Sequence, residues 1–435
     1  MKTASSEITY PIPMSELTHF YVTSGARASV IVYELTLDEP LQKDRLSQAL
    51  GVALSFFPNF AVKLLLTPQG LFFAPNHETP SIVEEDGKSL HLGEDETHHF
   101  LFVLSYRNSL LRFRVHHSLS DGRGTLAFIK CVLGHYFGFS GPEVDPVPLA
   151  KDAPIFKPFL EGHINPSIQA RGTFNSTPES GVFAHPEPRF PADSGKARVF
   201  EITCPMDAIL KTTKRDDTTP VPFLAVLIAN AYRNLYPVGE KTIALGCAVD
   251  YRPIFHDDCR NNAAGSVALP YFNKIAEFDL PMQRTIMRAR LDLETQEENL
   301  IVGLTPFAGM VNSFKQIPLP ILEASKIISS KITSSASASR TTMVSYVGGV
   351  RWNKELDEHL RSIAVFYSPF AVAPYFMGIE DQGIWHLTCT QADNSDRLIK
   401  EICHLLQKET SDVTFTDRGI WVFDGLYLDH IPAIS

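Results

Sequence analysis

Apolar and polar residues alternate along some short stretches of this chain and recur at helical spacing along others. In the N-terminal third, alternating or β-branched runs predict half-buried strands, and apolar residues three and four positions apart predict amphipathic helices. The expected elements are a strand at 29–36, a helix at 41–57, a hairpin at 61–66 and 71–74, strands at 100–106 and 110–115, and a helix at 125–137. This order predicts a lobe of the α/β class with a mixed sheet.

A second group of predicted elements follows a long irregular segment. Residues 154–197 contain seven prolines with glycine and serine between them, which indicates a crossover linker. After the linker, the same patterns predict strands at 198–202, 243–249 and 385–390 and helices at 221–235, 280–296 and 396–409, followed by a tail. We therefore expect an N-terminal lobe at 1–153, a linker at 154–197 and a C-terminal lobe at 198–435.

Composition narrows the classes of function. The 435 residues are 44% hydrophobic and have a net charge of −10, which disfavours nucleic acid as a partner. The six cysteines form no Cys-x-x-Cys pair and lie in apolar or strand-like runs, which is typical of a protein without a disulfide framework. The first residues lack an apolar signal core, and the apolar runs are too short to span a bilayer. We expect a cytoplasmic protein with no transmembrane segment.

The junction between the strand at 110–115 and the helix at 125–137 contains the strongest candidate for chemistry. It begins with His116 and His117 and continues to Asp121 and Gly122. A neutral imidazole can accept and return a proton near neutral pH, so a histidine here is a candidate general base. Adjacent side chains on an extended strand point to opposite sides, so only one of the two can face a given substrate.

Three other interpretations of this junction remain open from the residues alone. Histidine pairs are common on surfaces, and the chain has a second one at His98 and His99. The spacing of His117 and Asp121 could belong to a metal pair, although the glycines argue against a helix there and no third ligand is evident. Asp121 could also be only the N-cap of the following helix.

The order His-His-x-x-x-Asp-Gly at 116–122 resembles the signature of the CoA-dependent acyltransferase superfamily, which includes chloramphenicol acetyltransferase, condensation domains and alcohol acetyltransferases. The resemblance implies two chloramphenicol-acetyltransferase-like lobes, each a mixed sheet with helices, and a channel between them. It implies that His117 is the general base, that Asp121 turns away and pairs with an arginine, and that His116 and Gly122 line the loop. Acyl-CoA would be a co-substrate, with no tightly bound cofactor and no metal.

Two later segments extend the resemblance. A predicted strand runs into an Asp-x-Arg-Pro sequence at 250–253, and in the superfamily the arginine of such a motif pairs with the aspartate of the loop. The resemblance therefore implies this role for Arg252, and the alternative is a surface arginine before a proline turn. The segment 344–349 resembles a strand of condensation-type lobes, in which Ser345 or Tyr346 would face the channel and donate to the developing oxyanion.

The remaining segments bear on the branch of the superfamily. Residues 14–21 resemble a stretch beside the channel in alcohol acetyltransferase-like proteins, or form a short core helix. The Asp-Phe-Gly-Trp-Gly motif of the plant enzymes is absent, and 370–375 take its place, which favours the alcohol acetyltransferase branch. The Ser/Ala/Thr-rich segment 329–342 predicts a plain surface loop, or a loop near the cofactor mouth where Lys331 and Arg340 meet CoA phosphates.

The expected activity is transfer of an acyl group from acyl-CoA to the hydroxyl of a small-molecule alcohol. N-acylation of an amine, or condensation from an acyl carrier protein thioester, is the alternative among enzymes. A catalytically silent relative that binds a carrier protein or another partner is the alternative from a different class. The joint presence of His117, Asp121 and Arg252 argues against that last alternative.

Overall fold

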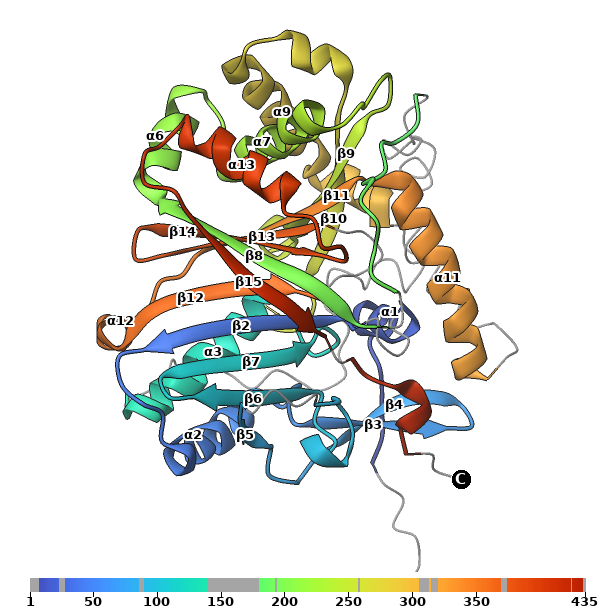
Figure 1. Ribbon diagram of the computed structural model, residues 1–435. Helices are drawn as coiled ribbons and strands as arrows, with labels where there is room; N and C mark the ends of the chain where they lie inside the picture. Colours follow the sequence, from blue (N-terminus) through green and yellow to red (C-terminus); the bar gives the residue numbers. More distant parts are fainter. Residues whose placement is uncertain are drawn as a thin grey trace, which may run out of the picture.

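The computed structural model is an α/β protein with two large mixed sheets and helices packed against them, as the sequence predicts (Figure 1). It describes residues 8–22, 28–85, 90–139, 180–191, 194–256, 259–304, 313, 320–368, 374–423 and 425–432. Within these ranges, no helix combines the length and the apolar composition that a membrane span needs.

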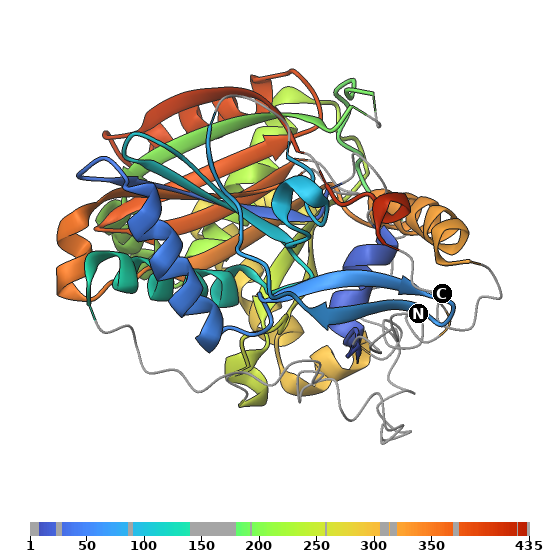
Figure 2. The same ribbon diagram turned by 90° about the horizontal axis from the view of Figure 1, so that it is seen from below.

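The N-terminal sheet has five strands in the order β12-β2-β7-β6-β5. In that order their bounds are Leu360–Tyr367, Val30–Leu37, Leu110–His116, Phe102–Arg107 and Ile82–Glu84. Helices α2 (Lys43–Phe56) and α3 (Gly122–Phe137) lie against the sheet (Figure 2). The ring of Phe128 on α3 meets Phe102 of β6 and Phe113 of β7, so aromatic side chains fill this core.

A small sheet and a short helix stand beside the N-terminal sheet. The small sheet has the order β1-β4-β3, with bounds Tyr10–Pro11, Gly70–Pro75 and Val62–Thr67. Its β3–β4 pair is the predicted hairpin, and Thr67 lies opposite Gly70 at the turn. Helix α1 (Met14–Val22) follows β1 and packs against α11 (Ile321–Ser339).

The C-terminal sheet has seven strands in the order β10-β9-β11-β13-β14-β8-β15. In that order their bounds are Ala264–Tyr271, Ile243–Asp250, Thr342–Gly349, Tyr375–Asp381, Ile384–Gln391, Lys196–Pro205 and Thr414–Val422. β11 runs parallel to both of its neighbours, and the other pairs are antiparallel. The remaining helices are α6 (Met206–Arg215), α7 (Pro220–Leu235), α8 (Arg252–Phe255), α9 (Leu280–Glu294), α12 (Lys354–His359) and α13 (Arg397–Gln407), with 3-10 turns η1 (Asp95–Thr97), η3 (Asn273–Glu277) and η4 (Leu428–His430).

The two sheets are joined by a strand from the C-terminal half that completes the N-terminal sheet, and by buried charges. β12 follows the C-terminal strand β11 in the chain, yet it pairs antiparallel with β2 of the N-terminal sheet. Arg418 of β15 lies 2.6 Å from Glu34 of β2 and 2.8 Å from Glu201 of β8, and Arg112 of β7 lies 2.5 Å from Glu34. One guanidinium therefore bridges a carboxylate from each sheet.

Two predictions from the sequence are wrong, and one lies largely outside the described residues. The segment 329–342 is not a loop: it forms the end of α11 and the start of β11, because Ala324, Ser325, Ile328 and Ser329 form a buried helical stripe. The predicted C-terminal tail contains β15, the edge strand of the seven-stranded sheet. Most of the predicted linker, 154–179, lies outside the described residues.

Candidate active site

The histidine loop connects β7 to α3, the strand and the helix that the sequence predicts around it. β7 ends at His116, and α3 begins at Gly122, three residues before the predicted start. Asp121 is the N-cap of α3, and its Oδ1 accepts a hydrogen bond of 3.0 Å from the Gly124 amide. The cap extends the helix over both glycines, because it satisfies an amide of the first turn.

Asp121 also forms the ion pair that the resemblance implies. Its Oδ2 lies 2.8 Å from Nη2 of Arg252 and accepts a hydrogen bond of 2.9 Å from the Ala263 amide. Asp121 is 2% exposed, so its carboxylate is turned away from solvent. Burial lowers the pKa of Arg252, but Asp121 and Asp250 outweigh it and hold that pKa above its usual range. Arg252 thus stays charged, and its contact with Asp121 ties the N-terminal loop to the C-terminal lobe.

Arg252 is itself held from several sides. Its Nη1 lies 3.0 Å from Oδ1 of Asp250, and its Nε and Nη2 donate to the backbone carbonyls of Cys259 and Asn261 at 2.5 and 2.7 Å. Asp250 in turn lies 3.0 Å from Arg123, the second residue of α3. This network fixes the guanidinium and the start of α3 relative to each other.

The glycines of the loop allow close packing. At Gly124, a Cβ atom would overlap the Ser120 hydroxyl and the Arg260 carbonyl, so the helix start approaches the C-terminal lobe at van der Waals distance. The Ser120 hydroxyl donates to that same carbonyl at 2.6 Å. Gly122 accepts a hydrogen bond of 2.7 Å from the Tyr33 hydroxyl through its carbonyl. Gly122 is therefore a packing position at the base of the loop.

His117 lies among aromatic and polar side chains. Its ring stacks on that of His19 from α1, with centroids 4.3 Å apart and planes at 11°, and Tyr367 of β12 meets it edge-on at 5.5 Å. The Asn262 side chain donates to the His117 carbonyl at 2.6 Å, and the His117 amide donates to the Ser29 carbonyl at 2.7 Å. Its Nδ1 is buried and has no hydrogen-bond partner among the described residues. His117 is thus held by its backbone and by its ring contacts.

Burial lowers the pKa of His117, although its own backbone, the charge of Asp121 and the Asn262 side chain act in the opposite direction. His19 has its pKa lowered by burial first and by His117 and His116 second. Both stacked rings are therefore neutral at physiological pH. A neutral imidazole is the form that accepts a proton.

His116 points away from His117 and has a different environment. It is fully buried, stacks on Phe20 at 5.1 Å, and places its Nδ1 2.7 Å from the Ser118 hydroxyl. Burial, and to a smaller extent His117, lowers its pKa to about 3. The expectation that only one of the two histidines can face a substrate agrees with this arrangement, in which His116 is part of the core.

Ser345 and Tyr346 lie on opposite faces of β11. The side chains of Tyr346 and Trp385 both lie beside Gly378, on the side where a Cβ atom would stand. The Trp385 ring meets Phe223 of α7. Ser345 lies opposite Met377, and the strand pairing places Thr388 on the same face. The Thr388 hydroxyl donates to the Val365 carbonyl of β12 at 2.6 Å, so this face looks toward the N-terminal sheet. Ser345 therefore lies on the face between the sheets, and Tyr346 lies on the helix-covered face.

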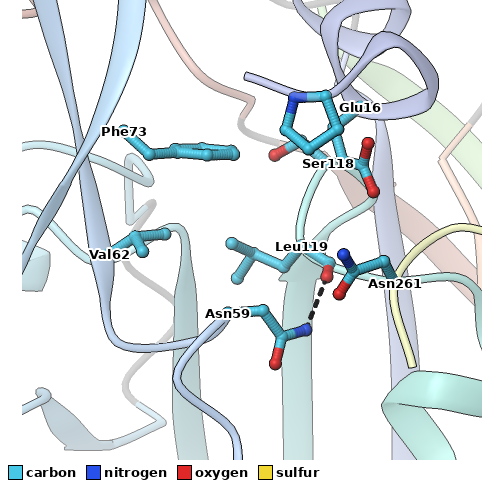
Figure 3. Close-up of a pocket in the computed structure, with 8 residues that line it drawn as sticks. Glu16, Asn59, Val62, Phe73, Ser118, Leu119 and Asn261 are labelled. Carbon is cyan, nitrogen blue, oxygen red and sulfur yellow. Dashed lines mark hydrogen bonds between the residues drawn. The ribbon is translucent and has the colours of Figure 1, made fainter. Parts of the chain in front are cut away.

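Open space reaches the loop from two sides. On one side, Phe73, Val62 and Leu119 face each other beside Glu16 and Asn261 around a small pocket of about 20 Å³, enough for about one water molecule (Figure 3). On the other, an open cleft of about 690 Å³ is lined by residues of the Arg252 network and of α3. In the described part of the chain, no three metal-ligating side chains come together.

Sequence reasoning did not single out three of the residues around His117. His19 lies in the segment 14–21, which the resemblance placed beside the channel as a whole. Tyr367 lies in β12, a strand that was not predicted, and Ser29 precedes β2. The Ser29 hydroxyl lies 2.9 Å from Nδ1 of His19 and 2.6 Å from the Tyr367 hydroxyl, so the three side chains form one hydrogen-bonded chain beside His117.

Comparisons with known proteins agree with this fold. No protein-family model and no curated protein sequence matches the chain. Polyketide synthase associated protein 5 from Mycobacterium tuberculosis is similar in structure, with a TM-score of 0.64 at 13% identity over 93% of this chain and 100% of that chain. Fusarium graminearum TRI101, in complex with coenzyme A and deoxynivalenol, gives a TM-score of 0.63 at 12% identity over 94% and 99% of the two chains.

The epimerization domain of tyrocidine synthetase B is also similar, with a TM-score of 0.60 at 11% identity over 94% of this chain and 98% of that one. These three proteins all have the two-lobed arrangement, and each is matched over nearly its whole length. At such low identity the likeness concerns the fold. The chain shares the two-lobed fold of these three proteins, which is the fold that its histidine loop led us to expect.

Proposed function

We propose that this protein transfers an acyl group from an acyl-CoA thioester to the hydroxyl of a small-molecule alcohol, with His117 as the general base. The observation that supports this most directly is the placement of a neutral His117 on a loop held by the Asp121–Arg252 pair between the two sheets. The similar protein TRI101 is in complex with coenzyme A and a small molecule, which agrees with this pair of substrates.

The proposed reaction needs one proton transfer in each direction. His117 takes the proton from the acceptor hydroxyl as its oxygen bonds to the thioester carbonyl carbon. The tetrahedral intermediate then collapses, the carbon–sulfur bond breaks, and the imidazolium returns the proton to the leaving thiolate. Asp121 touches neither substrate in this scheme, because both of its oxygens are used by Arg252 and by backbone amides.

Ser345 is the better placed of the two candidate oxyanion donors. It lies on the face between the sheets, whereas Tyr346 packs toward the helix side. A hydrogen bond that strengthens as the carbonyl oxygen gains charge is worth about 10²–10³ in turnover. We therefore assign Ser345, rather than Tyr346, to the oxyanion.

The test is release of free thiol from a set of acyl-CoAs in the presence of pooled alcohols and amines. Alcohol-dependent release by the wild type should fall by about 10²–10⁴-fold in His117→Ala, the usual scale for loss of a general base. His77→Ala, at an exposed position away from the loop, is the matched control and should retain full activity. Amine-dependent release would identify N-acylation instead. No release from any pair would contradict the CoA donor, and binding to carrier proteins would then be measured.

A further inference from the structure

Arg340 lies on the face of the C-terminal sheet that looks toward the N-terminal sheet. It connects α11 to β11, the helix and strand at the right of Figure 1. A Cβ atom on Gly246 of β9 would lie 2.6 Å from Cδ and 2.7 Å from Nε of Arg340. Glycine at 246 thus leaves the space in which the arginine side chain lies flat against the strand.

This position belongs to the same continuous surface as His117. Met343 is paired with Gly246 on one side and with Tyr375 on the other, so these three residues share a face. The ring of Tyr375 lies 5.0 Å from that of Tyr367, and Tyr367 lies 5.5 Å from the His117 ring. Two aromatic contacts therefore lead from the strands beneath Arg340 to the proposed base.

The charge of Arg340 is not balanced by the described residues around it. Its hydrogen bond of 3.3 Å goes to the neutral hydroxyl of Ser339, and no carboxylate of the described chain lies within ion-pair distance. Burial raises the pKa of Cys247 to about 12 and also raises the pKa of Tyr251, so both of these neighbouring groups are neutral. Its Nε is buried without a partner among the described atoms, and burial lowers the pKa of the guanidinium.

Other buried arginines of the structure differ from Arg340 in this respect. Arg252 pairs with Asp121 at 2.8 Å, Arg284 pairs with Asp216 at 2.5 Å, and Arg418 pairs with Glu34 at 2.6 Å. Burial of a charge is unfavourable unless a partner of opposite charge is present. A guanidinium that lies between two sheets, with no carboxylate partner among the residues that the structure describes, has the properties of a binding group for an anion.

We propose that Arg340 binds an oxyanion group, a carboxylate or a phosphate, of a ligand that lies between the sheets. The proposal rests on the proposed function, since it gives one of the two substrates an acidic group. A carboxylate would come from the acceptor, and a phosphate would come from the CoA or carrier-linked donor. The planar guanidinium can hold either group through two parallel hydrogen bonds.

Binding measurements test the proposal without requiring turnover. We would measure affinities by calorimetry for two matched pairs, 4-hydroxybenzoate with its methyl ester and 3-hydroxybutyrate with its methyl ester, and separately for CoA and pantetheine. The variants are Arg340→Met, which removes the charge at similar volume, and Arg340→Lys, which retains it without the fork. Lys326→Met removes a charge from an exposed position of the same helix and is the matched control.

If the acceptor supplies the anion, the wild type prefers a free acid over its ester, and Arg340→Met loses that preference by about 30-fold or more, equivalent to 2 kcal/mol. If the donor supplies the anion, Arg340→Met weakens the binding of CoA by the same factor and leaves the affinity for pantetheine unchanged. Lys326→Met changes neither the preference for the free acid nor the affinity for CoA. Affinities unchanged by Arg340→Met for all six probes would overturn the proposal. So would a drop in melting temperature of Arg340→Met with no change in any preference, which would indicate a structural role.

The same measurements on His117→Ala separate this proposal from the proposed function. Loss of thiol release in that variant concerns the base, whereas its preference for the anionic probe should remain equal to that of the wild type. If the wild type shows the Arg340-dependent preference but no acyl transfer, the anion site stands and the catalytic assignment fails. If acyl transfer occurs but the wild type shows no Arg340-dependent preference, the catalytic assignment stands and the anion site fails.

Discussion

Removal of the Asp121 carboxylate should destabilise the whole protein, since it breaks contacts on both sides of the loop. Asp121→Ala removes the ion pair to Arg252 at 2.8 Å, the cap on the Gly124 amide at 3.0 Å and the bond from the Ala263 amide at 2.9 Å. Loss of one partner from a buried ion pair costs about 3–5 kcal/mol. Loss of the N-cap adds about 1 kcal/mol.

One neighbour offsets part of this loss. Asp250 remains 3.0 Å from Nη1 of Arg252 and still neutralises some of its charge. The Ala263 amide, by contrast, loses its acceptor in a buried position, which costs about 1–3 kcal/mol. The three terms together amount to about 5–9 kcal/mol, and because Asp250 offsets part of the ion-pair term, we expect the free energy of unfolding of Asp121→Ala to fall by about 4–7 kcal/mol. Asp121→Asn can keep the oxygen that caps Gly124, so it should lose less than Asp121→Ala.

A double-mutant cycle isolates the ion pair from the other contacts. Urea denaturation of wild type, Asp121→Ala, Arg252→Met and the double variant should be followed by circular dichroism and tryptophan fluorescence, whose transitions must coincide. The double variant should lose less stability than the sum of the single losses, by at least about 1 kcal/mol. Asp292→Ala, which removes an exposed partner of Arg288 at 3.5 Å, is the control and should change stability by less than about 0.5 kcal/mol. Additive losses would refute the buried pair.

Three further predictions concern the same loop. Burial lowers the pKa of His116 to about 3 in the folded protein, against 6.5 in the unfolded chain, so between these pH values the unfolded chain binds more protons and the free energy of unfolding falls as pH falls, by up to about 1.4 kcal/mol per pH unit. His116→Gln should flatten this pH dependence in urea titrations from pH 6.5 to 4.5, and an unchanged slope would contradict the buried neutral His116. Burial lowers the pKa of His117, so the acidic limb of kcat/KM should lie below pH 6.5, and a limb at or above that value contradicts the assignment. Gly124→Ala places a Cβ against the Arg260 carbonyl and should lower the free energy of unfolding by about 1–3 kcal/mol. Gly51→Ala, in open space on α2, should raise it slightly, and equal effects of the two substitutions would contradict the close approach at Gly124.

Local patterns were sufficient for the central elements and for the histidine loop. β7 alternates because one of its faces is buried and the other is partly exposed. β2 and α7 are buried on nearly all sides, and their apolar runs are correspondingly dense. The Asp121–Arg252 contact joins residues far apart in the chain, so spacing alone could not predict it. It was expected only through the resemblance to a family, and the structure places the two side chains together.

The wrong predictions share a physical cause. In α11, which packs against α1, the buried stripe includes Ser325 and Ser329, which count as polar in the sequence although both are almost fully buried. In β15, Asp417 and Arg418 interrupt the alternation, because both form ion pairs with neighbouring strands. Tertiary partners decided both elements, and no local pattern contains those partners. His19 was missed as an individual residue for the same reason, since its contact with His117 comes from chain packing.

The pairing of β12 with β2 has a consequence for how the protein is made. During synthesis, β2 emerges early, but the strand that completes its outer edge, Leu360–Tyr367, follows more than three hundred residues later. At 5–20 residues per second, the ribosome leaves that edge open for roughly 15 to 65 s. An unpaired strand edge templates association with other chains, so the nascent N-terminal half is an aggregation-prone species and a substrate for chaperones. A fragment that ends before β12 should aggregate for this reason, and supplying the missing strand as a separate peptide should suppress that aggregation.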